Sequence, residues 1–416
     1  MGFLIILAMR SLRPKEDRVF LTKIFIAGIL VRVLLLTSAH FIYAFLDKWE
    51  YYYENMRAIR LFGDSAFTTV RSWWIAQYFS GTPLKDLVFQ STFGDYGHSG
   101  YLYIMGLYYY LFGFSPVSVS LINCIASVLT GILFYFMAKE IAGIKQAKIV
   151  ASLVIFFPSL ILWSITNLKD SMFIFFTAVI LWAFMQVTII KKNGYLILLI
   201  AAAFLQASFR KYIFIPTIAI LGLSYLIMKK KTKYILLVAS VLIVTLLVTK
   251  FDLREPIYKL IGYHRGVVHS GGFVYRLFDD WIYQRGSPIA ELSNLSIIKG
   301  LFKGWFHFLL EPFPWKISST FSILAFPQMI VWYFLLPFSI IGLFFQLRHN
   351  WQKSLVFIMY FLSIGSILIL TGGNVGTDFR FRDILTSIFI LFAGIGICRI
   401  FCLEQKGLAS GAMEKR

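Results

Sequence analysis

Residues 171–190 read SMFIFFTAVILWAFMQVTII and contain no charged side chain. A helix of this length rises about 30 Å, which is the thickness of the hydrocarbon core of a bilayer. Similar apolar blocks recur along the 416-residue chain, in which 59% of the residues are hydrophobic and 14% are charged. Soluble domains carry about 25% charged residues, so this composition excludes an ordinary water-soluble protein. The sequence therefore predicts a helical integral membrane protein.

Ten stretches have the length and apolar character of membrane-spanning helices. They are residues 20–46, 115–139, 148–167, 171–190, 194–210, 212–229, 234–250, 327–347, 353–372 and 384–401. No part of the chain has the composition of a soluble domain, so we expect residues 1–416 to form a single membrane domain. The predicted fold class is all-α, a polytopic membrane protein with about ten spans.

Positive charge is distributed unevenly between the connections that join these spans. One side carries 20 basic and 5 acidic residues, whereas the rest of the chain carries 20 basic and 15 acidic residues. Because short cytoplasmic loops are enriched in Lys and Arg, we expect the first side, with both termini, to be cytoplasmic. The net charge of +20 is then mostly topological and gives no reason to expect nucleic-acid binding. The richness in Lys, Ile and Phe points to a bacterial plasma (inner) membrane.

Two long connections fall on the opposite, outer side, residues 47–100 and residues 251–326. In the first, residues 50–62 and 70–79 place apolar and aromatic side chains at nearly helical spacing. This spacing predicts amphipathic helices at the membrane interface, where Trp and Tyr are favoured. In the second, residues 311–316 read EPFPWK, which is typical of an aromatic anchoring loop.

The sequence contains none of the P-loop, GxGxxG, HExxH or GxSxG motifs. A cytosolic nucleotide-driven enzyme is therefore disfavoured. The remaining candidates for chemistry are acidic and basic residues in the outer connections.

The first acidic candidates lie in the first outer connection. Asp47 follows the first span, and Glu50 comes one helical turn later, beside a run of tyrosines. A carboxylate at a membrane–water boundary under aromatic rings has a raised pKa, which suits a general base near neutral pH. A solvated helix end is the alternative. Asp95 and His98 lie in the glycine-containing stretch GDYGHSG, which suits either a ligand or a turn before a helix.

Two short outer connections carry further candidates. Lys169 stands next to Asp170, whose carboxylate can cap the following helix or contact a donor phosphate or a metal ion. Arg210 and Lys211 form a second basic pair between two spans.

A third group precedes the last span. Arg380 and Arg382 lie beside a glycine-containing stretch, and guanidinium groups bind phosphate or pyrophosphate bidentately. Ion pairs with Asp378 and Asp383 are the alternative. Arg32 lies inside the first span, where a charged side chain needs a partner or a polar cavity, and the sequence does not decide between a structural role and a lipid contact.

Several motifs occur together in the order found in one group of membrane enzymes. They are Asp47 before Tyr51, Tyr52 and Tyr53; Gly100-Tyr101-Leu102; Leu111-Phe112-Gly113; Phe157-Pro158-Ser159 with Trp163; Lys169-Asp170; and Gly376 before Arg380-Phe381-Arg382. With these motifs the chain resembles the GT-C-type membrane glycosyltransferases, in the broad superfamily of the dolichyl-phosphate-mannose protein mannosyltransferases and their bacterial relatives. The resemblance is best over residues 20–215.

The resemblance implies a sugar donor on a polyprenyl phosphate, bound from the membrane, and a glycan, lipid or protein acceptor at the outer face. Asp47 would be the general base, with Glu50 as the nearest second acid, and Asp170 would lie beside the donor phosphate. The arginines would neutralise the leaving phosphate. A divalent metal is a possible cofactor, and its ligands stay open.

Three other functions stay open on the sequence alone. A polymerase or ligase of cell-envelope polysaccharide also uses lipid-linked glycans and outer arginines. A lipid or glycan transporter would need charged or broken helices at mid-membrane, where only Arg32 clearly lies. A non-catalytic scaffold is the fourth reading.

Overall fold

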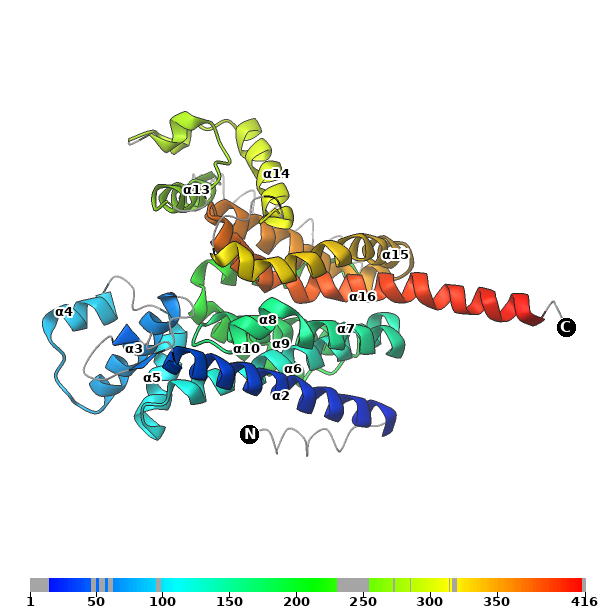
Figure 1. Ribbon diagram of the computed structural model, residues 1–416. Helices are drawn as coiled ribbons and strands as arrows, with labels where there is room; N and C mark the ends of the chain where they lie inside the picture. Colours follow the sequence, from blue (N-terminus) through cyan, green and yellow to red (C-terminus); the bar gives the residue numbers. More distant parts are fainter. Residues whose placement is uncertain are drawn as a thin grey trace. The chain divides into compact units, whose positions relative to one another are not determined.

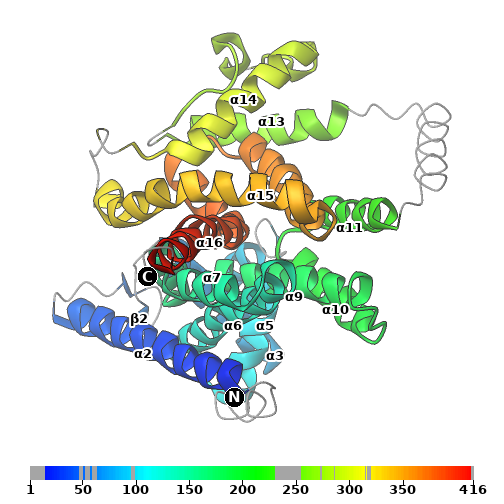
Figure 2. The ribbon, with the colours of Figure 1, turned by 90° about the vertical axis from the view of Figure 1, so that its right-hand side faces the viewer.

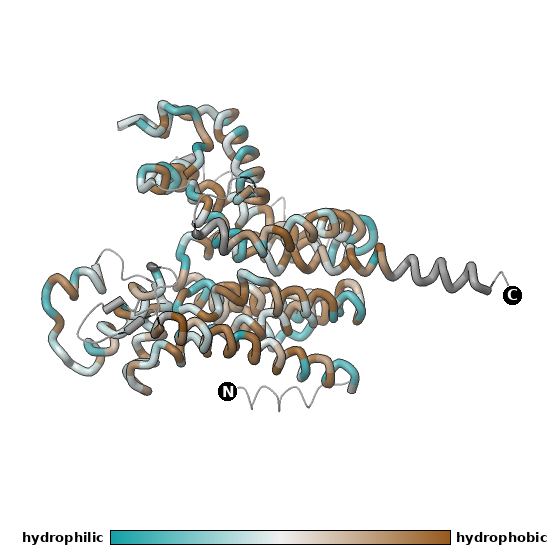
Figure 3. The backbone as a smooth tube through the Cα atoms, in the orientation of Figure 1, coloured by the Kyte–Doolittle hydropathy of each residue, from teal (hydrophilic) through white to brown (hydrophobic). Residues whose placement is uncertain are grey.

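A computed structural model describes residues 15–45, 50–51, 57–58, 63–94, 99–229, 254–271, 274–284, 286–313, 315 and 320–413. Nearly all of these residues are helical, which confirms the all-α polytopic class (Figure 1). The chain divides into two compact units, one comprising Met1–Phe214 and Ile400–Arg416, and the other Ile215–Arg399. Apolar residues follow the helices of both units (Figure 3).

The first unit is a set of helices packed around α6. Its elements are α2 (Lys15–Phe45), β1 (Glu50–Tyr51), β2 (Arg57–Ala58), α3 (Gly63–Phe79), α4 (Asp86–Phe89), the π-helix η1 (Gln90–Gly94), α5 (Gly100–Phe112), α6 (Pro116–Ala142), α7 (Ile144–Phe156), α8 (Pro158–Ser164), α9 (Asp170–Thr188), α10 (Tyr195–Phe209) and the 3-10 helix η2 (Lys211–Ile213). α6 packs against α2, α7 and α9. Glycine makes the close approach possible, because a Cβ on Gly131 or Gly28 would come within 2.6 Å of the Ile155 side chain.

The helix pair α7 and α8 bends by 50° where they join. Pro158 is the first residue of α8 and has no N–H to continue the ladder of α7. Ser164 ends α8, and a short loop of residues 165–169 leads to α9.

The second unit contains two long helical elements and a series of short ones, which can be followed in Figure 2. They are α11 (Phe214–Met228), α13 (Arg254–His269), the 3-10 helices η3 (Asp280–Tyr283) and η4 (Ile289–Glu291), α14 (Asn294–Leu310), α15 (Thr320–Thr371) and α16 (Val375–Met413). α15 is broken at Asn350, whose backbone is not helical. We call residues 320–349 the first arm of α15 and residues 351–371 its second arm.

The described residues contain six helices that are long and apolar enough to cross a membrane, or seven with the bent pair α7–α8. One of the six covers both arms of α15, and α10 is a shorter apolar helix. Nine of the ten predicted stretches therefore fall on apolar helices of this part of the chain. The tenth, residues 234–250, lies outside the described residues.

The helix predicted over residues 50–62 was wrong where the structure describes it. Glu50 and Tyr51 pair with Ala58 and Arg57 as two short antiparallel strands. Tyr51 begins a run of tyrosines, and aromatic residues favour extended backbone. The helix predicted over residues 70–79 is the second half of α3, whose Ile75 packs against Gly106 of α5.

The last span begins earlier than predicted. α16 starts at Val375, nine residues before the predicted start at residue 384, so Arg380 and Arg382 lie in a helix and not in a loop. Asp378, Arg382 and Asp383 are buried against protein. Hydropathy misplaces such a start, because polar side chains that are satisfied by protein partners still count as polar.

Candidate active site

In the first unit, α6 holds the loop that precedes α9. The side-chain amide of Asn123, which is completely buried, donates to the carbonyl oxygens of Thr166 at 2.8 Å and Leu168 at 3.1 Å. The same amide donates to the hydroxyl of Tyr101 at 3.1 Å. Buried carbonyls need such partners, so Asn123 sets the course of the chain into Asp170.

A second anchor of this loop is Asn167. Its amide donates to Thr69 at 2.9 Å, its carbonyl oxygen accepts from Ser120 at 2.7 Å, and its backbone N–H donates to Ser65 at 3.1 Å. The loop is therefore bonded to α3 and α6 at once.

Asp170 and Arg210 meet at the centre of this arrangement. One carboxylate oxygen of Asp170 accepts from the Arg210 guanidinium at 3.0 Å, and both side chains are buried. Arg210 also donates to the Tyr212 hydroxyl at 3.0 Å and lies 5.6 Å from the ring of Phe173. The residue before α9 is Lys169, which makes no side-chain cap, and the Asp170 carboxylate is turned to Arg210. The structure thus joins Asp170 and Arg210 in a buried charge pair.

Other predicted residues surround this pair. Lys169 donates to the Phe209 carbonyl at 3.3 Å, and Lys211 is exposed at the start of η2. Tyr101 lies 5.7 Å from the Phe209 ring, and burial together with the charge of Asp170 raises its pKa. Gly100 permits this approach, because a Cβ there would come within 2.2 Å of Ser208.

Four predicted residues cannot be placed around this pair. Asp47, Asp95 and His98 lie outside the described residues. Glu50 begins β1, and its side chain lies outside the described part. Their roles remain predictions.

In the second unit, Arg380 and Arg382 have different surroundings. Arg382 is completely buried and donates to the carbonyl oxygens of Glu311 at 2.9 Å and Phe308 at 3.3 Å. Its guanidinium also lies 4.7 Å from the Trp332 ring. These carbonyls lie at the C-terminal end of α14, where a cation is favoured by the helix dipole. Arg380 is half-buried.

A buried polar cluster lies next to Arg382. The Tyr275 hydroxyl donates to Asp378, and the rings of Tyr275 and His307 stack with centroids 4.4 Å apart. His307 lies 3.2 Å from a carboxylate oxygen of Glu311. Burial and the Asp378 carboxylate raise the pKa of Tyr275, so its hydroxyl is a neutral donor. Asp378 is thus bonded to Tyr275.

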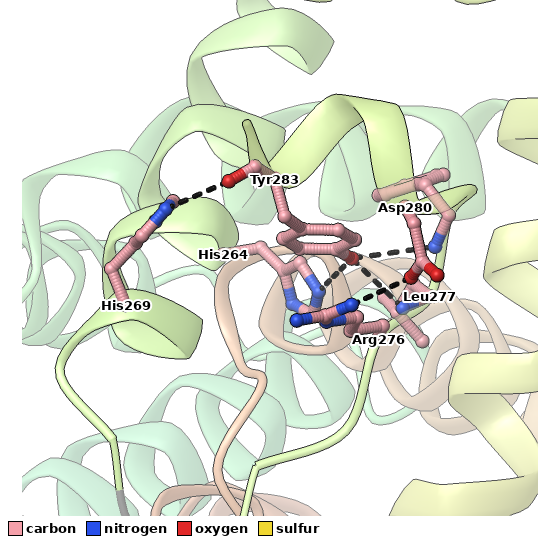
Figure 4. A network of polar contacts seen from close by, with 7 residues as sticks. His264, His269, Arg276, Leu277, Asp280 and Tyr283 are labelled. Carbon is pink, nitrogen blue, oxygen red and sulfur yellow. Dashed lines mark hydrogen bonds and ion pairs between the residues drawn. The ribbon is translucent and has the colours of Figure 1, made fainter. Parts of the chain in front are cut away.

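A second polar network joins α13 to residues 276–283, with the buried side chains of His264 and Tyr283 at its centre (Figure 4). His264 is completely buried and lies within hydrogen-bond distance of the Gly372 carbonyl and of the Tyr283 hydroxyl, the latter at 2.9 Å. The Tyr283 hydroxyl accepts from the backbone N–H of Leu277 at 2.9 Å. Burial lowers the pKa of His264 to about 4, so the ring is neutral at pH 7.

The divalent metal that the resemblance leaves possible stays a prediction. Among the described residues no three His, Cys, Asp or Glu side chains gather as a metal site requires. The Asp170 oxygen nearest Arg210 is already in an ion pair. No chemical step is therefore assigned to a metal.

One comparison with known proteins is informative. Residues 100–250 match the family model described as dolichyl-phosphate-mannose-protein mannosyltransferase. This match supports a GT-C-type membrane glycosyltransferase. The matched range contains Tyr101, Asn123, Asp170 and Arg210, which form the buried arrangement of the first unit. No curated protein matches the chain significantly.

The residues that hold the Asp170–Arg210 arrangement together were not among the candidates predicted from the sequence. Asn123 lies in the middle of a predicted span, and Asn167 in the loop beyond another. A buried amide within an apolar stretch is costly, which is a usable signal of a partner. The amide of Asn123 inside an apolar stretch therefore indicates that it needs a hydrogen-bond partner. The sequence does not indicate that the partners are the carbonyl groups of Thr166 and Leu168.

Proposed function

We propose that this glycosyltransferase transfers a sugar from a polyprenyl-phosphate donor to a hydroxyl of a glycan, lipid or protein acceptor. The observation that carries the proposal is the buried Asp170–Arg210 pair, which lies at the start of an apolar helix within the matched residues. A lipid-linked donor brings its phosphate to the end of a span, where a guanidinium group can bind it.

In the proposed reaction the acceptor oxygen attacks the anomeric carbon of the sugar. The bond between that carbon and the phosphate oxygen breaks, and polyprenyl phosphate leaves with the electron pair. The proton of the acceptor hydroxyl passes to Asp47, with Glu50 as the nearest second acid. This division of roles follows general base catalysis and electrostatic stabilisation of a leaving anion.

Arg210 is the cation best supported as a phosphate contact in the first unit. Its ion pair with Asp170 fixes the guanidinium, and Lys169 and Lys211 add positive charge on either side of the pair in sequence. Preorganised charge of this kind stabilises a departing phosphate without costly rearrangement. We keep the half-buried Arg380 as a further candidate phosphate contact and Asp95 and His98 as contacts to the sugar or acceptor, whereas the completely buried Arg382 binds the end of α14.

We further propose that transfer takes place at the outer face of a bacterial plasma membrane, with both termini in the cytoplasm. The uneven distribution of Lys and Arg supports this orientation.

The base is tested by Asp47→Asn in membranes supplied with a polyprenyl-phosphate sugar and an acceptor. We expect transfer to fall by roughly 10²- to 10⁴-fold, because the variant cannot take the proton. Asp86→Asn, a change of an exposed acid at the start of α4, is the matched control and should keep full activity. Retained transfer with Asp47→Asn would remove Asp47 from the mechanism.

The phosphate contact is tested by Arg210→Lys, which keeps the charge and loses the planar fork. We expect donor affinity to fall about tenfold or more, while insertion into the membrane is unchanged. Arg348→Lys, at an exposed position of α15, is the control. Unchanged donor binding with Arg210→Lys would show that the Asp170–Arg210 pair only stabilises the fold.

A further inference from the structure

α14 carries an apolar stripe that no described part of the chain covers. Leu295, Ile298, Phe302 and Phe306 are spaced three or four residues apart, so they share one face of the helix. Their exposed fractions are 60%, 51%, 73% and 54%. Such a contiguous stripe marks an interaction surface.

The opposite face of α14 is packed on α15. Gly304 lies against Ile369, since a Cβ on the glycine would come within 2.2 Å of that side chain. Trp305 stacks on Phe361 with ring centroids 5.6 Å apart and donates to Ser366 at 3.3 Å. Figure 1 shows the axis of α14 standing steeply to that of α15, not along it.

These contacts set the depth of α14 in the membrane. Phe361 lies ten residues before the end of the second arm at Thr371, which is about 15 Å of helix rise. On the first arm, Trp332 donates to the Leu309 carbonyl at 2.8 Å. Trp332 lies seven residues, or about 10 Å, beyond Ala325, where the candidate span begins. α14 thus packs well inside both ends of the spanning hairpin, at the level of lipid and not of water.

The charges beside the stripe agree with a lipid environment. Lys299 and Lys303 are exposed next to Ile298 and Phe302, and α14 contains no acidic residue. Lysine side chains bury their stems along apolar surface and reach with the ammonium group to the lipid phosphates.

We propose that α14 is an in-plane membrane helix whose Leu295–Ile298–Phe302–Phe306 face is immersed in the lipid of one leaflet. Lys299 and Lys303 contact the phosphates of that leaflet, which is the one at the ends of the α15 arms remote from Asn350. This surface is independent of the proposed sugar transfer.

The test places nitroxide labels along α14 in the full chain, reconstituted in nanodiscs that contain phosphatidylglycerol. A background in which the three cysteines are replaced by alanine receives Leu295→Cys, Ile298→Cys, Phe302→Cys or Phe306→Cys. Collision rates are then measured with oxygen, which concentrates in lipid, and with a water-soluble nickel chelate. Asp280→Cys, at a solvent-exposed side chain of the same unit, is the matched control.

We expect the ratio of oxygen to nickel collisions to be several-fold higher at the four stripe positions than at Asp280. High nickel accessibility at the stripe would overturn the proposal by placing it in water. Immobile labels with low accessibility to both reagents would also overturn it, by showing a protein partner such as a second copy.

The lysine contacts are tested by Lys299→Gln with Lys303→Gln, which should weaken retention of spin-labelled phosphatidylglycerol about fivefold per lysine. Unchanged retention would contradict those contacts.

Discussion

Arg32 illustrates how a costly residue is accommodated in an apolar span. Its guanidinium, completely buried, donates to the hydroxyls of Ser127 at 2.9 Å and Ser164 at 3.1 Å and to the Gly28 carbonyl at 3.1 Å. These bonds connect α2 to α6 and to the end of α8. The sequence required a partner for Arg32, and the structure supplies polar groups of the protein itself.

Asn123 should be important for stability in the same way. Asn123→Ala leaves the Thr166 and Leu168 carbonyls buried without their donor, which costs about 1–3 kcal/mol of unfolding free energy. Thermal unfolding in detergent measures this loss. Thr37→Ala, which removes an exposed hydroxyl bonded within its own helix, is the control. Equal unfolding temperatures for the two variants would contradict the anchoring role of Asn123.

His264 should make residues 264–283 sensitive to acid. The neutral ring donates from Nδ1 to the Gly372 carbonyl and accepts at Nε2 from Tyr283, and protonation would destroy that acceptor. Because its pKa is lowered from 6.5 to about 4, the unfolded segment binds the proton more readily. The stabilisation, about 3 kcal/mol, is present above pH 6.5 and is lost as the pH falls toward 4.

Hydrogen exchange of residues 264–283 between pH 7 and pH 4 measures this effect. Corrected for the intrinsic rate, protection should fall with pH in the native chain, and the fall should be absent in His264→Gln. His349→Gln, at an exposed position, should behave as the native chain does. An unaltered pH dependence in His264→Gln would show that another group is responsible.

At the scale of elements, α15 and α16 are held together by backbone contact at glycines. A Cβ on Gly396 would come within 2.0 Å of the Phe338 carbonyl oxygen, and a Cβ on Gly342 within 1.9 Å of the Phe392 carbonyl oxygen. Helices in lipid gain little from apolar burial, so close packing of small residues must supply their association.

Gly396→Ala should therefore separate α16 from the first arm of α15. We expect a loss of about 1–3 kcal/mol, since backbone atoms cannot yield as a flexible side chain can. Gly222→Ala is a fair comparison, because a Cβ at that helical position meets nothing within 4 Å. Unfolding in detergent distinguishes them, and a Gly396→Ala variant as stable as Gly222→Ala would disprove the contact.

Because α16 starts at Val375, the side chains of Arg380 and Arg382 point in different directions. Arg380 and Arg382 are two residues apart, which in a helix rotates their side chains by about 200°. One is completely buried against the end of α14, and the other is half-buried. In a loop, both guanidinium groups could turn to one ligand. In the helix they point in nearly opposite directions, so Arg380 and Arg382 have different surroundings.

At the scale of the whole molecule, the distribution of charge predicts the orientation in the membrane. The basic residues that flank the predicted spans concentrate on one side, and we expect this side, with both termini, to be cytoplasmic.

Reporter fusions test this orientation. A fluorescent protein fused after Arg416 should fluoresce in a bacterial host, because it folds only in the cytoplasm. Alkaline phosphatase inserted after Gly286 should be active, because that segment is expected outside. Inactive phosphatase together with a dark C-terminal fusion would reverse the topology.

Much of the architecture was readable because hydrophobic length is a local property. Residues 171–190, with no charge, had to form a helix in a membrane, and α9 covers nearly the whole stretch. The same reading succeeded for α6 and for the two arms of α15. It failed at residues 50–51 and 57–58, which form two short paired strands, because the partner strand and not the local spacing decides there.

The sequence by itself determined that this protein is a helical membrane protein, because a bilayer leaves an apolar chain no other way to satisfy its backbone. It also identified Asp170 and Arg210 as candidates. Only the tertiary structure decided that these two, 40 residues apart, form one buried ion pair, and that Arg382 faces the end of α14. The reason is physical: a buried charge takes whichever partner the packing brings within about 3 Å, and that choice depends on helices far apart in the chain.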